Sequence, residues 1–141
     1  MTDALRRLLD AGLMEEVEPH GEDALLRLDE AERHLASAGQ IAANDPNGAF
    51  QLAYDAARKA ATAHMLARGL RVTNQPGAHA TTGRYAVSEI GEAFAPFDRM
   101  RRRRNRAEYG TTLISEREVA DAVAHARVMV ETVRAVLSAG S

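Results

Sequence analysis

Apolar side chains recur every three or four residues through most of the chain, which is the spacing of one face of an α-helix. Three long segments show it: from Glu22 to a break at 44–46, from Pro46 to Gly69, and from Ser115 to Leu137. The clearest apolar positions are Leu25, Leu28, Ala31, Leu35 and Ala38, then Phe50, Ala53, Tyr54, Ala57, Ala61 and Met65, then Val119, Val123, Ala126, Val130 and Val133. We therefore predict three long core helices.

Local signals at the helix ends support these boundaries. Asp45 precedes Pro46, which is the order expected for an N-cap followed by proline in the first turn. Ser115 with Glu118 three residues later forms a capping-box sequence at the start of the last helix. Gly69 is a natural end for the second of the three helices.

The remaining segments carry weaker patterns. Residues 3–17 have helical spacing before an interruption at 18–21, which predicts a short leading helix. Residues 71–83 lack an apolar period and predict a loop with a helix entry near 80–83. A further helical region runs from Tyr85 to Tyr109, kinked or split at Pro96 and stopped by Gly110. No segment indicates a β-strand.

Together these elements predict an all-α fold: an antiparallel four-helix bundle with a short extra N-terminal helix. A chain of 141 residues, 45% of them apolar, fits one domain spanning 1–141, with 1–21 as leading helix and linker and 22–141 as the bundle.

Composition excludes several classes of function. The chain has no cysteine, so disulfides and thiol chemistry are excluded, and a soluble cytoplasmic protein is the simplest interpretation. No run of apolar residues reaches the roughly 18 needed to span a bilayer. There is no glycine-rich phosphate loop, Rossmann fingerprint or histidine pair with metal-ligand spacing, so we expect no cofactor and no metal.

The net charge of −2 gives no general attraction to polyanions, but basic residues are concentrated at 99–106, RMRRRRNR. On a helix, Arg101, Asn105 and Tyr109 share one stripe and Arg104 lies on the next one. Guanidinium groups present a planar fork of donors that suits phosphate oxygens. Arg104, Asn105 and Tyr109 are therefore the candidate catalytic residues, and the candidate RNA- or phosphate-binding residues are Arg101, Arg102, Arg103 and Arg106.

A structural interpretation of the same run is open. In it, the arginines pair with Asp98, Glu92, Glu108 and the acids of the last helix, and form only a solvated surface. By residue type and spacing alone this interpretation is the more common outcome.

The segment FDRMRRRRNRAEYG at 97–110, with AYDAARKAATAHMLARGLRV at 53–72 and AHATT after it, resembles the actinobacterial branch of the HEPN domain family. The resemblance covers about Phe50 to Gly110. It implies a helical bundle, commonly dimeric, and in many members a metal-independent endoribonuclease whose motif is an arginine, four to six residues, then a histidine. Arg104 and Asn105 match the opening of that motif.

The motif histidine is replaced in this chain. Tyr109 stands where it would fall after Arg104, and in the alternative register beginning at Arg102 the position holds Ala107. Because a phenol is a poor base at neutral pH, efficient cleavage is not expected. The resemblance thus implies an RNA- or nucleotide-binding homodimer with weak or degenerate ribonuclease activity. The alternative is a non-catalytic partner in a toxin–antitoxin type system, such as the partner of a nucleotidyltransferase.

Two other groups of residues receive structural interpretations. We expect His64 to be a hydrogen-bonded core histidine, and we expect Phe50 and Tyr54 to be packing residues rather than a base-stacking platform. The family resemblance implies that His79 caps the following helix, with a role in the site as the less favoured alternative.

Overall fold

The structure is a computed structural model that describes residues 1–110 and 113–140. The described part is predominantly helical, as the sequence predicts, with two short strands. In chain order the elements are α1 (Asp3–Asp10), β1 (Met14–Glu16), α2 (Gly21–Ile41), α3 (Pro46–Arg68), β2 (Leu70–Val72), α4 (Ala78–Glu89), the 3-10 turn η1 (Glu92–Phe94), α5 (Phe97–Tyr109) and α6 (Glu116–Ala139).

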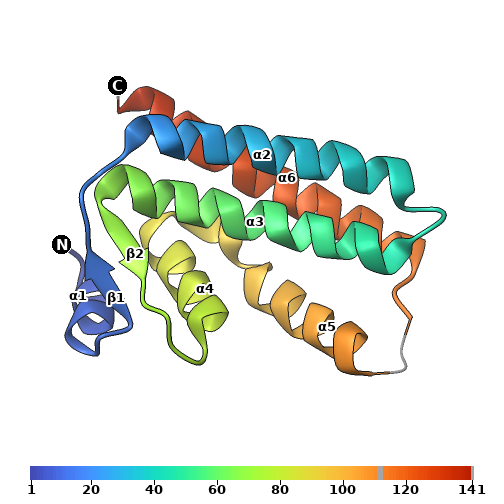
Figure 1. The fold of residues 1–141 in the computed structure, drawn as a ribbon, viewed down its shortest axis with the longest axis horizontal. Coiled ribbons are helices and arrows are strands. Elements are labelled where there is room, and N and C mark those ends of the chain that lie inside the picture. Colours follow the sequence, from blue (N-terminus) through green and yellow to red (C-terminus); the bar gives the residue numbers. More distant parts are fainter. Residues whose placement is uncertain (111–112, 141) are drawn as a thin grey trace.

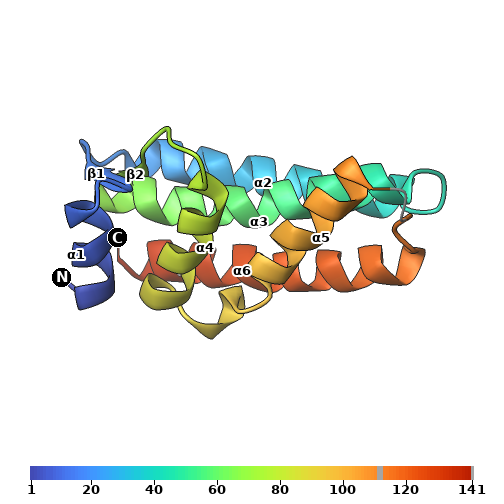
Figure 2. The same cartoon turned by 90° about the horizontal axis from the view of Figure 1, so that it is seen from below.

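The three long helices α2, α3 and α6 lie side by side, and α3 runs opposite to α2 but in the same direction as α6 (Figure 1). Every alanine on the inner faces of α3 is fully buried, so neighbouring helices approach its backbone closely. The chain returns from the end of α3 to the start of α6 through α4, η1 and α5, which lie on the other side of α3 from α2 (Figures 1 and 2). These two short helices carry the candidate site.

The helix-end signals work as predicted. Asp45 caps α3 by accepting a hydrogen bond from the backbone N–H of Gly48 at 3.0 Å. Ser115 and Glu118 form the complete capping box of α6. The sequence therefore located the starts of α3 and α6, whereas α2 ends at Ile41, before the expected break at 44–46.

The expectation of no strand is wrong. Residues 14–16 pair antiparallel with residues 70–72, in the register Met14 with Val72 and Glu16 with Leu70. The leading helix consequently ends at Asp10 rather than continuing to Val17. A three-residue strand is too short to show an alternating pattern, and its partner is more than fifty residues away, so neither segment carries a local signal of the pairing.

The expected long helix is divided into α4 and α5, with η1 between them. α4 ends at Glu89, just before Gly91 with its φ of 126°, and α5 begins directly after Pro96. The expected loop at 71–83 is shorter than predicted, because β2 takes its start and α4 already begins at Ala78. Gly83 allows α4 and α5 to meet closely: a Cβ at this position would lie 2.9 Å from Cδ1 of Phe97. The break between Glu89 and Phe97 thus creates a corner in which the two short helices pack against each other.

Gly69 offers a sharp test of the connection between α3 and β2. It adopts a left-handed conformation (φ 75°), and a Cβ there would lie 2.6 Å from the backbone oxygen of Val17. We expect Gly69→Ala to lower the free energy of unfolding by about 2 to 4 kcal/mol, since it adds backbone strain to a clash with main chain. Urea denaturation measures the change.

The matched control is Gly39→Ala in the exposed part of α2, where an added Cβ meets nothing within 4 Å. That change should raise stability by up to about 1 kcal/mol, because alanine favours helix over glycine. Equal stability of the two variants would contradict the conformation assigned to Gly69.

Candidate functional site

The arginine run on α5 divides into neutralised and free members. The guanidinium groups of Arg101 and Arg102 both pair with Asp98, at 2.8 and 3.2 Å. Arg103 pairs with Glu118 on α6, and its hydrogen bonds hold the pKa of that carboxyl below its usual range. The structural interpretation of the run is therefore correct for these three arginines.

Arg104 is different. Its guanidinium carbon lies 4.7 Å from the ring centroid of Tyr54 in a cation–π contact, and its Nη2 donates to Oδ1 of Asn105 at 3.1 Å. Among the described residues no carboxylate lies within 4.0 Å of it, and its Nε is buried without a hydrogen-bond partner. A buried donor without a partner is costly, and Nη1 of Arg103 shares this property. What distinguishes Arg104 is that no carboxylate among the described residues neutralises its charge, so the charge is available to an anion.

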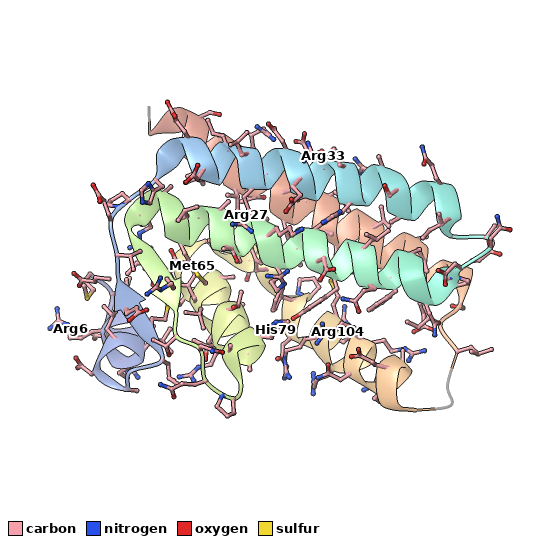
Figure 3. The ribbon with its side chains drawn as sticks, viewed as in Figure 1. Arg6, Arg27, Arg33, Met65, His79 and Arg104 are labelled. Carbon is pink, nitrogen blue, oxygen red and sulfur yellow. The ribbon has the colours of Figure 1, made fainter. Side chains whose placement is uncertain are left out.

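Tyr54 joins Arg104 to a residue from a third helix. Its hydroxyl lies 2.9 Å from Nδ1 of His79, the second residue of α4. Tyr54 itself is fully buried in α3 and packs on Phe97, with ring centroids 5.3 Å apart. Figure 3 shows His79 and Arg104 next to each other between α4 and α5. We name Tyr54, His79, Arg104 and Asn105 the Arg104–His79 cluster.

The electrostatics of the cluster keep both Tyr54 and His79 neutral at pH 7. Burial raises the pKa of Tyr54 to about 12, against the opposing effect of Arg104. Burial also lowers the pKa of His79, and the positive charges of Arg104 and Arg58 lower it further. The phenol therefore keeps its proton over the whole physiological range.

The proton on Tyr54 selects the histidine tautomer. Its hydroxyl has no hydrogen-bond partner other than His79 within the described part of the chain, so the buried O–H donates to Nδ1. The ring proton of neutral His79 must then sit on Nε2. Arg104 and His79 consequently both present donors, which suits a negatively charged oxygen and not a proton to be removed.

The prediction that His79 caps a helix is wrong. α4 starts after Gly77 without a side-chain cap, and the imidazole of His79 turns instead to Tyr54. The prediction that Tyr54 is a packing residue is correct, but its hydroxyl has the additional role of orienting His79. No sequence spacing could have joined residues 54, 79 and 104, because they belong to three different helices.

The other candidate residues do not share one groove. Arg103 and Arg106 line a cavity of about 290 Å³ between α5 and α6, together with His125. Arg104 instead lines a cavity of about 220 Å³ beside the first turn of α3. The side chain of Tyr109 lies outside the described residues, although its backbone ends α5.

His64 is a hydrogen-bonded core histidine, as predicted. It is 5% exposed, and its Nδ1 lies 2.7 Å from the hydroxyl of Tyr85. Arg68 donates to the same hydroxyl at 3.1 Å and pairs with Glu89 at 3.0 Å. This network joins α3 to α4, and none of its residues lines either of the two cavities above.

The described part of the chain contains neither a group of metal-ion ligands nor a membrane-spanning helix. No group of three or more histidine, aspartate or glutamate side chains is arranged to hold a metal ion there. None of the helices in that part of the chain is both long enough and apolar enough to span a bilayer.

Comparisons with known proteins identify no relative. No family model matches the chain, and no curated protein and no solved structure shows a significant match to it.

Proposed function

We propose that this protein binds single-stranded RNA and that the Arg104–His79 cluster holds one of its phosphodiester groups. The observation that carries this proposal is the free guanidinium of Arg104, held on the ring of Tyr54 with a buried donor that has no partner. Its neighbours Arg101, Arg102 and Arg103 on the same helix are instead paired with carboxylates.

Two residues of the cluster carry donors for a phosphate, although Arg104 and His79 line different cavities. The fork of Arg104 can donate to one or two of its oxygens, and Nε2 of His79 can donate to another. Arg58 and Arg101 act electrostatically on both Tyr54 and His79, so they add positive potential at the same place. A single strand fits better than a duplex, because its phosphates can follow an uneven surface.

The resemblance to HEPN domains is consistent with this proposal. The predominantly helical fold agrees with a HEPN-like bundle, and Arg104 with Asn105 matches the start of the family motif. His79 then supplies, from a different helix, the imidazole that the motif lacks. We retain the homodimer and the nucleotidyltransferase partner as predictions that follow from the resemblance alone.

A second candidate is slow metal-independent cleavage at the same phosphate, favoured by the presence of His79. In that reaction His79 takes the proton of the 2′-hydroxyl, the 2′-oxygen bonds to phosphorus, and the 5′-oxygen leaves and takes a proton from water. This cleavage reaction needs a free lone pair on Nε2 of His79. The hydrogen bond that Nδ1 accepts from Tyr54 instead places the ring proton on Nε2. Binding without cleavage is therefore the function that the geometry supports better.

The pH dependence of binding tests the role of His79. Its pKa is below the usual 6.5 in the free protein, and a bound phosphate raises it by stabilising the imidazolium. RNA affinity should therefore be low and constant at pH values above the pKa that His79 has in the complex. It should rise as the pH falls from there toward the pKa that His79 has in the free protein. If binding raises the pKa of His79 by one unit, affinity should be about tenfold higher at low pH than at high pH. Fluorescence anisotropy with a labelled 12-nucleotide RNA, in EDTA from pH 8 to 5.5, measures it.

His79→Asn should remove most of this pH dependence, while His20→Asn, at an exposed position before α2, should keep it. Equal pH profiles for wild type and His79→Asn would exclude His79 from the phosphate site. Products ending in 2′,3′-cyclic phosphate would instead assign His79 the role of a base.

A further inference from the structure

A separate cavity of about 420 Å³ opens between α2, α3, β2 and the start of α4. It adjoins the Arg104–His79 cluster, because His79 belongs to its wall. Arg104 does not line it. Figure 3 labels Arg27, Met65 and His79, which contribute to it from α2, α3 and α4. Its volume is within the range of small-molecule sites.

The floor of the cavity is apolar. It is formed by Met65, Leu66, Leu70 and Val72, and Met65 and Leu70 are almost completely buried. An aromatic ring laid on this floor would bury its face against aliphatic carbon, chiefly that of the half-buried Leu66 and Val72, with Met65 beneath them. The floor thus suits a planar, partly apolar group.

The rim of the cavity is cationic. It carries Arg27, Arg58 and Arg71, and no carboxylate is among the lining residues. Arg71 is neutralised by Glu15, at 2.7 Å between Nε and Oε1. Within the described part of the chain Arg27 has no ion pair, and Arg58 has only a distant one of 3.9 Å with Asp55. Two guanidinium groups are therefore available to an anion.

Hydrogen-bonding groups stand between floor and rim. The hydroxyls of Thr62 and Thr82 donate to backbone oxygens one turn earlier, at 2.9 and 3.0 Å, so their oxygens remain available as acceptors. The exposed amide of Asn74 supplies both a donor and an acceptor. Such groups match the amino and carbonyl edges of a nucleobase.

We propose that this cavity binds a nucleoside monophosphate, with its base on the floor around Met65 and its phosphate between Arg27 and Arg58. An inorganic anion would leave the floor unused, and an uncharged aromatic compound would leave the two guanidinium groups unused. The site goes beyond the proposed RNA function, because Arg104 takes no part in it.

Isothermal titration calorimetry with adenosine 5′-monophosphate and with inorganic phosphate tests the proposal. The nucleotide should bind at least about tenfold more tightly than phosphate, since only the nucleotide covers the floor. Arg27→Ala combined with Arg58→Ala should weaken nucleotide binding at least about tenfold. Arg104→Ala should change it by less than about twofold. The NMR signal of the Met65 methyl group should shift on addition of the nucleotide, because a base ring lies against it.

Each other outcome has a definite meaning. Equal affinity for nucleotide and phosphate, or no binding of either, would overturn the proposal. So would a loss in Arg104→Ala as large as that in the double variant, because the nucleotide would then occupy the cluster. RNA binding that depends on Arg104 without nucleotide binding would overturn the cavity proposal alone. Nucleotide binding without RNA binding would overturn the proposed function alone. Thermal unfolding of the double variant, whose two side chains lie at the surface, checks that it remains folded.

Discussion

Replacing Arg104 with alanine should weaken the binding of single-stranded RNA by about ten- to a hundredfold at low salt, the cost of one charge-assisted, bidentate phosphate contact. The side chain is free of carboxylate partners among the described residues and rests on Tyr54, so it is ordered before RNA arrives. Pre-ordering reduces the entropy lost on binding. Fluorescence anisotropy with the labelled 12-nucleotide RNA, at 50 and 200 mM salt, measures the effect.

Two matched variants separate charge from geometry. Arg104→Lys keeps the charge but loses the planar fork and the flat contact with the ring of Tyr54, so it should recover only part of the affinity. Arg33→Ala removes an exposed arginine from α2, which Figure 3 places away from the cluster, and should change affinity by less than about twofold. Arg27 is unsuitable as a control because it lines the neighbouring cavity.

Salt provides the second readout of the same experiment. Each phosphate contact that Arg104 makes releases counterions, so the logarithm of the affinity should fall with the logarithm of salt less steeply in Arg104→Ala than in wild type. If wild type and Arg104→Ala bind RNA equally weakly and with the same salt dependence, the RNA proposal fails. Arg104 would then have only a structural role against Tyr54.

Acidification should destabilise the protein chiefly through His64. Burial lowers the pKa of His64 to about 4, and the positive charge of Arg68 acts in the same direction. In the unfolded chain the pKa is near 6.5. Between pH 6.5 and 4 the unfolded state therefore binds a proton that the folded state does not. Stability is unaffected above this window and falls by up to about 3 kcal/mol on crossing it.

Urea denaturation of wild type and His64→Gln at pH 7.5, 6, 5 and 4.5 measures this contribution. The variant should be less stable at pH 7.5, because it disturbs the hydrogen bond to Tyr85, but its stability should decline less toward acid. His34 and His79 also have lowered pKa values and contribute to the decline in both proteins. Only the difference between the two curves reports on His64. Parallel curves would contradict a neutral, buried His64.

The sequence alone determined the long helices and their ends, because these depend on local physics. The apolar spacing of α2, α3 and α6, the cap at Asp45 and the capping box at Ser115 each involve residues within a few positions of one another. Pro96 likewise predicted a break, since proline lacks the backbone donor that a continuous helix needs, but α4 ends earlier, at Glu89. The same pattern also predicted that His64 is buried and hydrogen-bonded.

Tertiary structure decided the small sheet and the membership of the site. The pairing of Glu15 with Arg71, fifty-six residues apart, leaves no periodic trace in either segment. The sequence pointed to the arginines of α5 but could not separate Arg103, which Glu118 of α6 neutralises, from Arg104, which lies on the ring of Tyr54 and has no carboxylate partner among the described residues. His79 joined the cluster because α4 packs beside α5 against α3. Which arginine is free depends on what the neighbouring helices place opposite it, and that is a property of packing, not of spacing along one helix.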